Sequence, residues 1–168
     1  MCPELPLIIE PAKLADSGER LSGQLQFTQL DRISDLILNR DGSVCFDLAF
    51  NKDDMGIVTI TGELSTDLTV ICQRCLNEMS LKLQSPILVG VIDNQQQIDV
   101  LPEMLEPVVA DEHRIPLIRL IEEELLLAMP FAPVHDRSAC PAAELVSELT
   151  VKKQNPFAVL KSLKTGKP

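Results

Sequence analysis

The sequence predicts an α+β fold in which an antiparallel meander sheet is covered by one long helix. Apolar and polar residues alternate along most of the chain between residues 44 and 91, and a helical pattern of apolar residues follows at 116–129. A period of two is typical of half-buried strands, whereas helical spacing predicts an amphipathic helix. Short turn signals separate about six predicted strands, so we expect antiparallel pairing in a sheet that is either open or barrel-like.

The first elements are short. Residues 5–9 predict a strand that ends before Pro11, and residues 11–16 predict one helical turn that ends before Gly18. Residues 21–27 alternate and predict the next strand. Thr28 is a suitable cap for a short turn after it.

The meander follows in the middle of the chain. Residues 44–50 alternate cleanly, and residues 57–61 are rich in β-branched side chains. Gly62 predicts a bulge or bend before the alternating run 64–70. Two further runs, 79–83 and 87–91, are separated by Pro86. Each run is short enough to be one strand of the sheet.

The long helix is predicted from Pro116, which suits a first helical turn, to about Met129. Its apolar side chains fall at helical spacing on one face, which should cover the sheet. That face consists of Leu117, Ile118, Ile121, Leu125 and Ala128, widened by Leu120 and Leu127. Leu126 falls on the opposite side.

The end of the chain differs in composition from the rest. We expect one domain over residues 1–137, followed by a partly disordered linker and tail over 138–168. Residues 151–168 contain five lysines and no acidic residue, and Asn155-Pro156 favours the start of a short helix. The basic tail has three interpretations: contact with RNA phosphate, contact with a protein groove, or solubilisation.

Charge and composition narrow the function classes. The 168-residue chain has a net charge of −10 and only 3% aromatic residues. Broad binding to nucleic acid is disfavoured because phosphate is repelled and stacking side chains are scarce, whereas a basic protein partner is favoured. The first ten residues contain no signal-peptide pattern, and no apolar run is long enough for a membrane span. We therefore expect a cytoplasmic protein without a membrane partner.

The pair Cys72 and Cys75 is the clearest chemical motif. The two thiols lie at the predicted tip of a hairpin, where they can converge on one metal ion or form a reversible disulfide. His135 and Cys140 are the candidates to complete a tetrahedral structural zinc site. The alternatives are a turn with two ordinary thiols, or a redox pair.

An acidic segment is the second candidate site. Residues 99–124 carry eight acidic residues against two arginines, and Glu122, Glu123 and Glu124 are consecutive. This segment is either a docking surface for a basic protein or a solvated helix face. No serine–histidine–aspartate pattern, glycine-rich phosphate loop or HExxH motif accompanies it, so we expect no enzymatic activity.

Several motifs together resemble one bacterial family. They are Cys72-Gln-Arg-Cys75 after a strand, Leu105-Glu106-Pro107, the acidic helix of residues 115–130, Pro133-Val134-His135-Asp136, and Asn155-Pro156-Phe157-Ala158-Val159-Leu160. The combination, which covers nearly the whole chain, resembles the YceD family of large ribosomal RNA subunit accumulation proteins.

The resemblance implies a non-enzymatic ribosome-biogenesis factor, needed for the synthesis, processing or stability of 23S ribosomal RNA. It implies a basic large-subunit ribosomal protein or a pre-ribosomal particle as partner, and leaves direct RNA contact open. The residues assigned to partner binding are Glu122, Glu123, Glu124, Asn155, Pro156 and Phe157. The rival hypothesis is a zinc- or thiol-dependent catalyst centred on Cys72 and Cys75.

Overall fold

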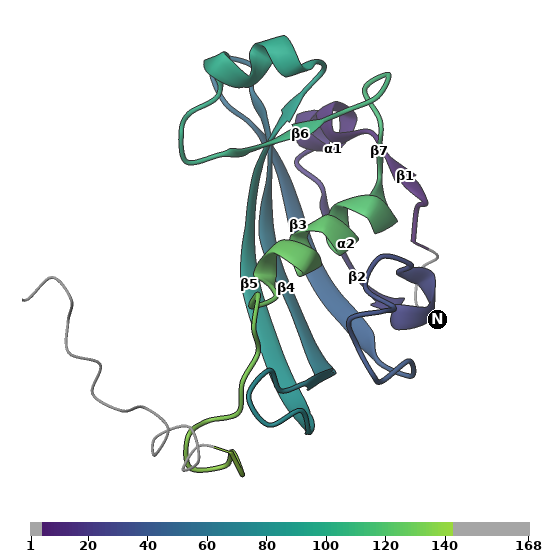
Figure 1. Ribbon diagram of the computed structural model, residues 1–168. Helices are drawn as coiled ribbons and strands as arrows, with labels where there is room; N and C mark the ends of the chain where they lie inside the picture. Colours follow the sequence, from purple (N-terminus) through teal and green to yellow (C-terminus); the bar gives the residue numbers. More distant parts are fainter. Residues whose placement is uncertain (1–4, 143–168) are drawn as a thin grey trace, which may run out of the picture.

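The computed structural model describes residues 5–142, in which a long curved sheet is crossed on one face by a helix (Figure 1). The elements, in chain order, are β1 (Ile8–Ile9), α1 (Pro11–Ser17), β2 (Arg20–Gln26), η1 (Phe27–Gln29), β3 (Ser43–Lys52), β4 (Val58–Ile71), β5 (Glu78–Ile92), η2 (Gln95–Val100), β6 (Glu106–Val109), β7 (Ile115–Pro116) and α2 (Leu117–Ala128).

The predicted α+β class is confirmed, and the predicted meander is confirmed in part. Strands β2, β3, β4 and β5 pair antiparallel in consecutive order. The next strand, β6, pairs parallel to β5, because the chain crosses over through η2 before it returns along the sheet. The expectation of a wholly antiparallel sheet is therefore wrong at this edge.

The described part of the chain also forms no barrel. The sheet order runs from β2 to β6, and these two outer strands do not pair with each other. A separate two-stranded sheet joins β1 to β7, just before α2 begins. The expected six strands of one sheet are replaced by five strands in one sheet and two in another.

Two sequence signals that predicted strand boundaries lie inside continuous strands. Gly62 is opposite Ile87, and Glu63 is opposite Pro86, in an unbroken β4–β5 register. Gly62 leaves room for the neighbouring strand, since a Cβ there would lie 1.9 Å from the carbonyl oxygen of Asp47. Pro86 is tolerated because β6 pairs only with the far end of β5, so that Pro86 lies on an open edge.

Helix α2 agrees closely with its predicted bounds and packs on the sheet as expected. Leu117, Ile121 and Leu125 are fully buried in one core with the inward-facing residues of β3, β4 and β5. Each such side chain stabilises the fold by about 1.5–3 kcal/mol. Leu127, predicted on the covered face, is 66% exposed, whereas Leu126 packs against the core. The prediction for these two leucines is wrong because Leu127 faces a groove beside β6 and not the sheet.

No helix within residues 5–142 combines the length and apolar character needed to cross a bilayer. The predicted linker beyond residue 142, the basic tail and the short helix at Asn155-Pro156 lie outside the described residues. The domain boundary at residue 137 stays a prediction.

The close contact at Gly62 gives a direct test of the β3–β4 register. We expect Gly62→Ala to lower the free energy of unfolding by about 2–3 kcal/mol, since the added methyl group forces the two backbones apart. Urea denaturation followed by circular dichroism measures the effect. Ser65→Ala, an exposed substitution on the same strand, is the matched control and should stay close to the wild type. Equal stability of the two variants would contradict the register.

Candidate metal centre and acidic groove

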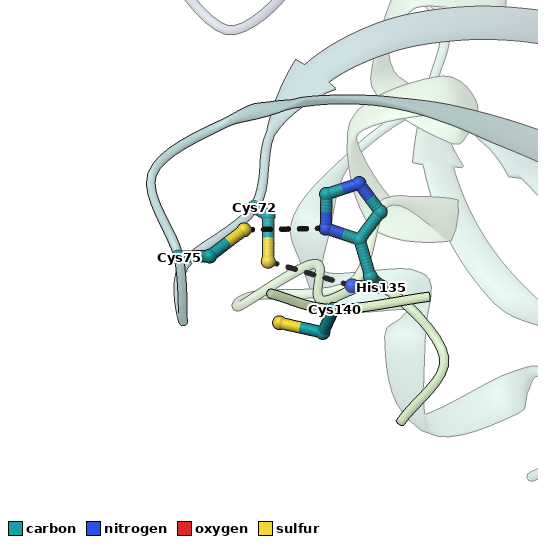
Figure 2. Close-up of side chains that lie close together, drawn as sticks. All are labelled: Cys72, Cys75, His135 and Cys140. Carbon is teal, nitrogen blue, oxygen red and sulfur yellow. Dashed lines mark hydrogen bonds between the residues drawn. The ribbon is translucent and has the colours of Figure 1, made fainter. Parts of the chain in front are cut away.

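The Cys72–Cys75 pair lies in the turn between β4 and β5, as the sequence predicted. The turn is closed by two backbone hydrogen bonds, from the N–H of Cys72 to the carbonyl of Asn77 (2.9 Å) and from the N–H of Leu76 to the carbonyl of Cys72 (2.9 Å). Leu76 has a positive φ of 61°, which is uncommon for a residue with a branched side chain. This conformation lets the chain reverse within a few residues while both thiols stay on the same side (Figure 2).

The segment that follows α2 lies against this turn. The N–H of Gln73 donates to the carbonyl of Pro133 at 2.8 Å, and the guanidinium of Arg74 reaches the carbonyl of His135 at 3.5 Å. The N–H of Ala139 donates to the carbonyl of Asp136 at 3.0 Å, which turns the chain back toward Cys72. The end of the described chain is thereby brought to the far end of the sheet (Figure 1).

All four predicted ligands meet at this point (Figure 2). The ligand atoms of Cys72, Cys75, His135 and Cys140 lie within 4.8 Å of one another, and the Sγ of Cys75 is 3.4 Å from Nδ1 of His135. Zinc–sulfur bonds of about 2.3 Å and zinc–nitrogen bonds of about 2.1 Å place neighbouring tetrahedral ligands at comparable separations. The cluster can therefore hold a metal ion with little rearrangement.

Backbone N–H groups make Cys72 an anionic ligand. Burial raises the pKa of this thiol, but hydrogen bonds from the backbone N–H groups of Cys75, His135 and Arg74 outweigh it and lower the pKa to about 5. The N–H of His135 lies 3.4 Å and that of Arg74 3.5 Å from the sulfur. At neutral pH Cys72 is a thiolate, which is the form that binds metals.

Cys75 behaves in the opposite way. A backbone N–H of Asn77 lowers its pKa, but burial and the neighbouring sulfurs of Cys72 and Cys140 outweigh that effect and raise the pKa. The protein alone thus stabilises one thiolate and resists a second. A divalent cation at the centre would reverse this preference, because its charge stabilises every coordinating thiolate.

The predicted acidic set does not form one surface. Glu122 is 6% exposed, and its carboxylate accepts a hydrogen bond from the backbone N–H of Arg32, so that it fastens the segment before β3 to α2. Glu123 is exposed, whereas Glu124 is 9% exposed. Successive helical residues point about 100° apart, so Glu122 lies on a different side of α2 from Glu123 and Glu124, which line one groove. Asn155, Pro156 and Phe157 lie outside the described residues.

Glu124 lines a groove of about 690 Å³ between α2 and β6, which we call the α2–β6 groove. Burial, together with the negative charges of Glu106 and Glu123, raises the pKa of Glu124 to about 7. The sequence alone did not identify Glu106 as a site residue. It belongs to the acidic segment, but only the parallel pairing of β6 brings it opposite the helix.

Comparison with known proteins gives a consistent result. Residues 60–164 match the model of a family described as "Large ribosomal RNA subunit accumulation protein YceD". A protein of Haemophilus influenzae with the same description is 32% identical over 168 aligned residues, which cover 96% of this chain and 97% of the relative. No solved structure matches the chain. The matched region begins in β4 and includes the whole Cys/His cluster.

The raised pKa of Glu124 predicts a pH-dependent cost to stability. Its folded pKa of about 7 lies above the ordinary value of 4.5, so the folded state holds the extra proton and stability falls as the pH rises through this window. We expect Glu124→Gln to raise the free energy of unfolding by about 1 kcal/mol or more at about pH 9. The contribution from titration should vanish below about pH 4.

Urea unfolding at a series of pH values measures this difference. Glu63→Gln removes an exposed carboxylate from the opposite side of the sheet and is the matched control for charge. A constant difference between Glu124→Gln and the wild type across the whole pH range would show that Glu124 titrates normally.

Proposed function

Because this chain belongs to the YceD family of large ribosomal RNA subunit accumulation proteins, we propose that it is a non-enzymatic ribosome-biogenesis factor needed for the synthesis, processing or stability of 23S ribosomal RNA. The similarity to the Haemophilus influenzae protein, which extends over 96% of the chain, carries this proposal. It covers both the sheet and the segment that completes the Cys/His cluster, so the features described above belong to the shared region.

The partner that we propose is a basic large-subunit ribosomal protein, or a pre-ribosomal particle that contains it. The net charge of −10 favours positively charged partners and disfavours direct contact with RNA phosphate. Of the three acids predicted to bind a partner, Glu123 and Glu124 line the α2–β6 groove, whereas Glu122 is engaged with Arg32. A role for Asn155, Pro156 and Phe157 stays a prediction.

We further propose that the Cys/His cluster binds one structural zinc ion. Three thiols and one imidazole are ligands that tetrahedral zinc prefers, and four protein ligands leave no position for a substrate. The ion would join the β4–β5 turn to the segment after α2. In the described residues, the bond from Gln73 to Pro133 is the one backbone–backbone hydrogen bond between that segment and the turn.

The second candidate function is a zinc- or thiol-dependent catalyst at Cys72 and Cys75. The lowered pKa of Cys72 favours it, since a thiolate is also a nucleophile. The burial of Cys72 argues against a catalyst. Its side chain has no exposed surface, so a substrate could not reach the sulfur unless the turn opened. The two functions differ in whether the metal site has an open position.

Metal analysis tests the structural zinc. We expect protein purified without chelator to contain about one zinc per chain and Cys75→Ala to lose it, with a lower melting temperature, because the removed ligand leaves an incomplete tetrahedron. Cys45→Ala is the control, as Cys45 is exposed and lies outside the cluster. Metal-free wild-type protein as stable as the zinc-loaded form would contradict a structural role.

The biological role is tested by complementation. In cells that lack the gene, we expect the ratio of 23S to 16S ribosomal RNA to fall, and the wild-type chain to restore it. Cys75→Ala should restore it poorly, because the segment after α2 is no longer fastened to the sheet, and Cys45→Ala should restore it fully. A normal ratio of 23S to 16S ribosomal RNA in the deleted strain would contradict the proposal. So would a purified protein that converts a small molecule while ribosomal RNA is unaffected.

A further inference from the structure

The α2–β6 groove has two walls of different character. The helix contributes Arg119, Leu120, Glu123, Glu124 and Leu127, which share one side of α2. The other wall includes residues 106–110, which contain all of β6, and Asp93, Asp111, Glu112 and Arg114 also line the groove. Within residues 5–142, β6 pairs only with β5, so its second backbone edge has no partner strand there.

Glu124 is a largely buried side chain that no other residue within 5–142 pairs with. Its side chain is 9% exposed and lines the groove, yet no residue within 5–142 forms a hydrogen bond or an ion pair with it. A charged group shielded from solvent is costly unless it is paired, but no fully shielded side-chain oxygen in the described residues lacks a hydrogen-bond partner, so the carboxylate of Glu124 is open to the groove. The neighbouring Glu122, by contrast, is buried with a hydrogen bond from the backbone of Arg32.

The groove has a negative field around this carboxyl group. Glu106 and Glu123 are the charged residues that act most strongly on Glu124, and both act to raise its pKa. Two arginines also border the groove. Arg114 lies 3.9 Å from the carboxylate of Glu10, and Arg119 is exposed. Neither arginine forms an ion pair with Glu124 within residues 5–142. The acidic residues that line the groove outnumber these two arginines, so the site favours a cation over phosphate.

A bare metal ion is a poor match for this site. In the described part of the chain, three or more ligand atoms lie within 4.8 Å of one another only in the cluster around Cys72. The carboxylates of Glu106, Glu123 and Glu124 are therefore too dispersed to chelate one ion. A larger organic cation can interact with all of them, and a guanidinium carries five donors for separate acceptors.

The apolar members of the groove fit the stem of such a cation. Val109 is 47% exposed and Leu127 66% exposed, so both offer apolar surface to the groove. Lysine and arginine bury their methylene stems on apolar surface while the charged group reaches a polar one. Leu127 is one helical turn from Glu123, so stem and charged group can be contacted together.

We propose that the α2–β6 groove binds a basic segment of a protein partner, with one lysine or arginine side chain seated beside Glu124. The inference rests on the proposed function in that both require a positively charged protein partner. It adds the place of contact and the residue type that is recognised. The volume of about 690 Å³ accommodates several residues, so the segment can lie along β6 with one basic side chain pointing toward the helix.

Binding would require ionised Glu124. A charge-assisted hydrogen bond to the incoming cation stabilises the carboxylate, so the bound partner lowers the pKa of Glu124 and a proton is released. Affinity should therefore rise between about pH 6 and pH 8. It should also weaken at high salt, though less than for a purely exposed pair.

The probe is N-acetyl-arginine amide, titrated into the full chain and followed by NMR of the glutamate carboxyl and leucine and valine methyl signals. We expect saturable shifts at Glu124, Leu127 and Val109. N-acetyl-citrulline amide, which has the same shape without the charge, is the matched ligand and should give no saturable shift. N-acetyl-lysine amide should bind at the same signals as the arginine compound.

Variants separate the groove from the general acidity of the protein. Glu124→Gln should weaken binding of the arginine compound about tenfold, as expected for loss of a charge-assisted hydrogen bond. Glu63→Gln removes the same charge from the other face of the sheet and should leave binding within about twofold. An unfolded variant would be recognised by loss of methyl dispersion, and Glu106→Gln then provides a second substitution in the same groove.

Two results would overturn the inference. One is equal binding of the arginine and citrulline compounds, and the other is an unchanged affinity in both Glu124→Gln and Glu106→Gln. Neither result would contradict the proposed role in ribosomal RNA accumulation, because that role is tested separately by the ratio of 23S to 16S ribosomal RNA in cells. A normal RNA ratio together with specific arginine binding would instead leave the groove in place and refute the proposed function.

Discussion

The β4–β5 ladder is the constraint on which both sites depend. Fourteen residue pairs run without interruption from Val58 opposite Val91 to Ile71 opposite Glu78. One end of this ladder carries the turn with Cys72 and Cys75, and the other end supplies the residues that pair with β6. A break in the ladder would shift the two ends relative to each other, because a one-residue slip exchanges the faces of a strand. The continuous pairing past Gly62 and Pro86 is therefore what fixes both sites.

Helix α2 connects the two sites because its sides have different neighbours. One side packs on the sheet through Leu117, Ile121 and Leu125, and another side lines the α2–β6 groove. The chain that leaves the helix then reaches the Cys/His cluster through His135. Movement of α2 on the sheet would change both the width of the groove and the position of this ligand. The hydrogen bond from Arg32 to Glu122 opposes such movement, so this buried acid has a structural role.

Sequence reasoning was most successful where side-chain chemistry or helical spacing decides the outcome, even though His135 lies 60 residues from Cys75 in the sequence. Thiol and imidazole chemistry identified Cys72, Cys75, His135 and Cys140 before any contact was known, and helical spacing placed α2 within a residue or two. Sequence-based prediction was wrong where a residue's position depends on contacts with a distant segment. The parallel pairing of β6 depends on how distant segments pack, and so do the different surroundings of Glu122, which is bonded to Arg32, and Glu124, which lines the groove. Leu127 was misplaced because helical periodicity cannot show how far along the helix the sheet extends.

Each site contains a buried acidic group, the thiol of Cys72 or the carboxyl group of Glu124. The two sites differ in how strongly their surroundings stabilise its charged form. In the cluster, backbone N–H groups hold the pKa of Cys72 at about 5, so an anion is stable there even before a cation arrives. In the groove, burial and two like charges act against the carboxylate of Glu124, and its pKa rises to about 7. A cation that binds only the folded chain stabilises it by mass action at either site. The cluster could therefore hold the metal ion that we propose. The groove, which can take up a proton when empty, suits a partner that binds and leaves.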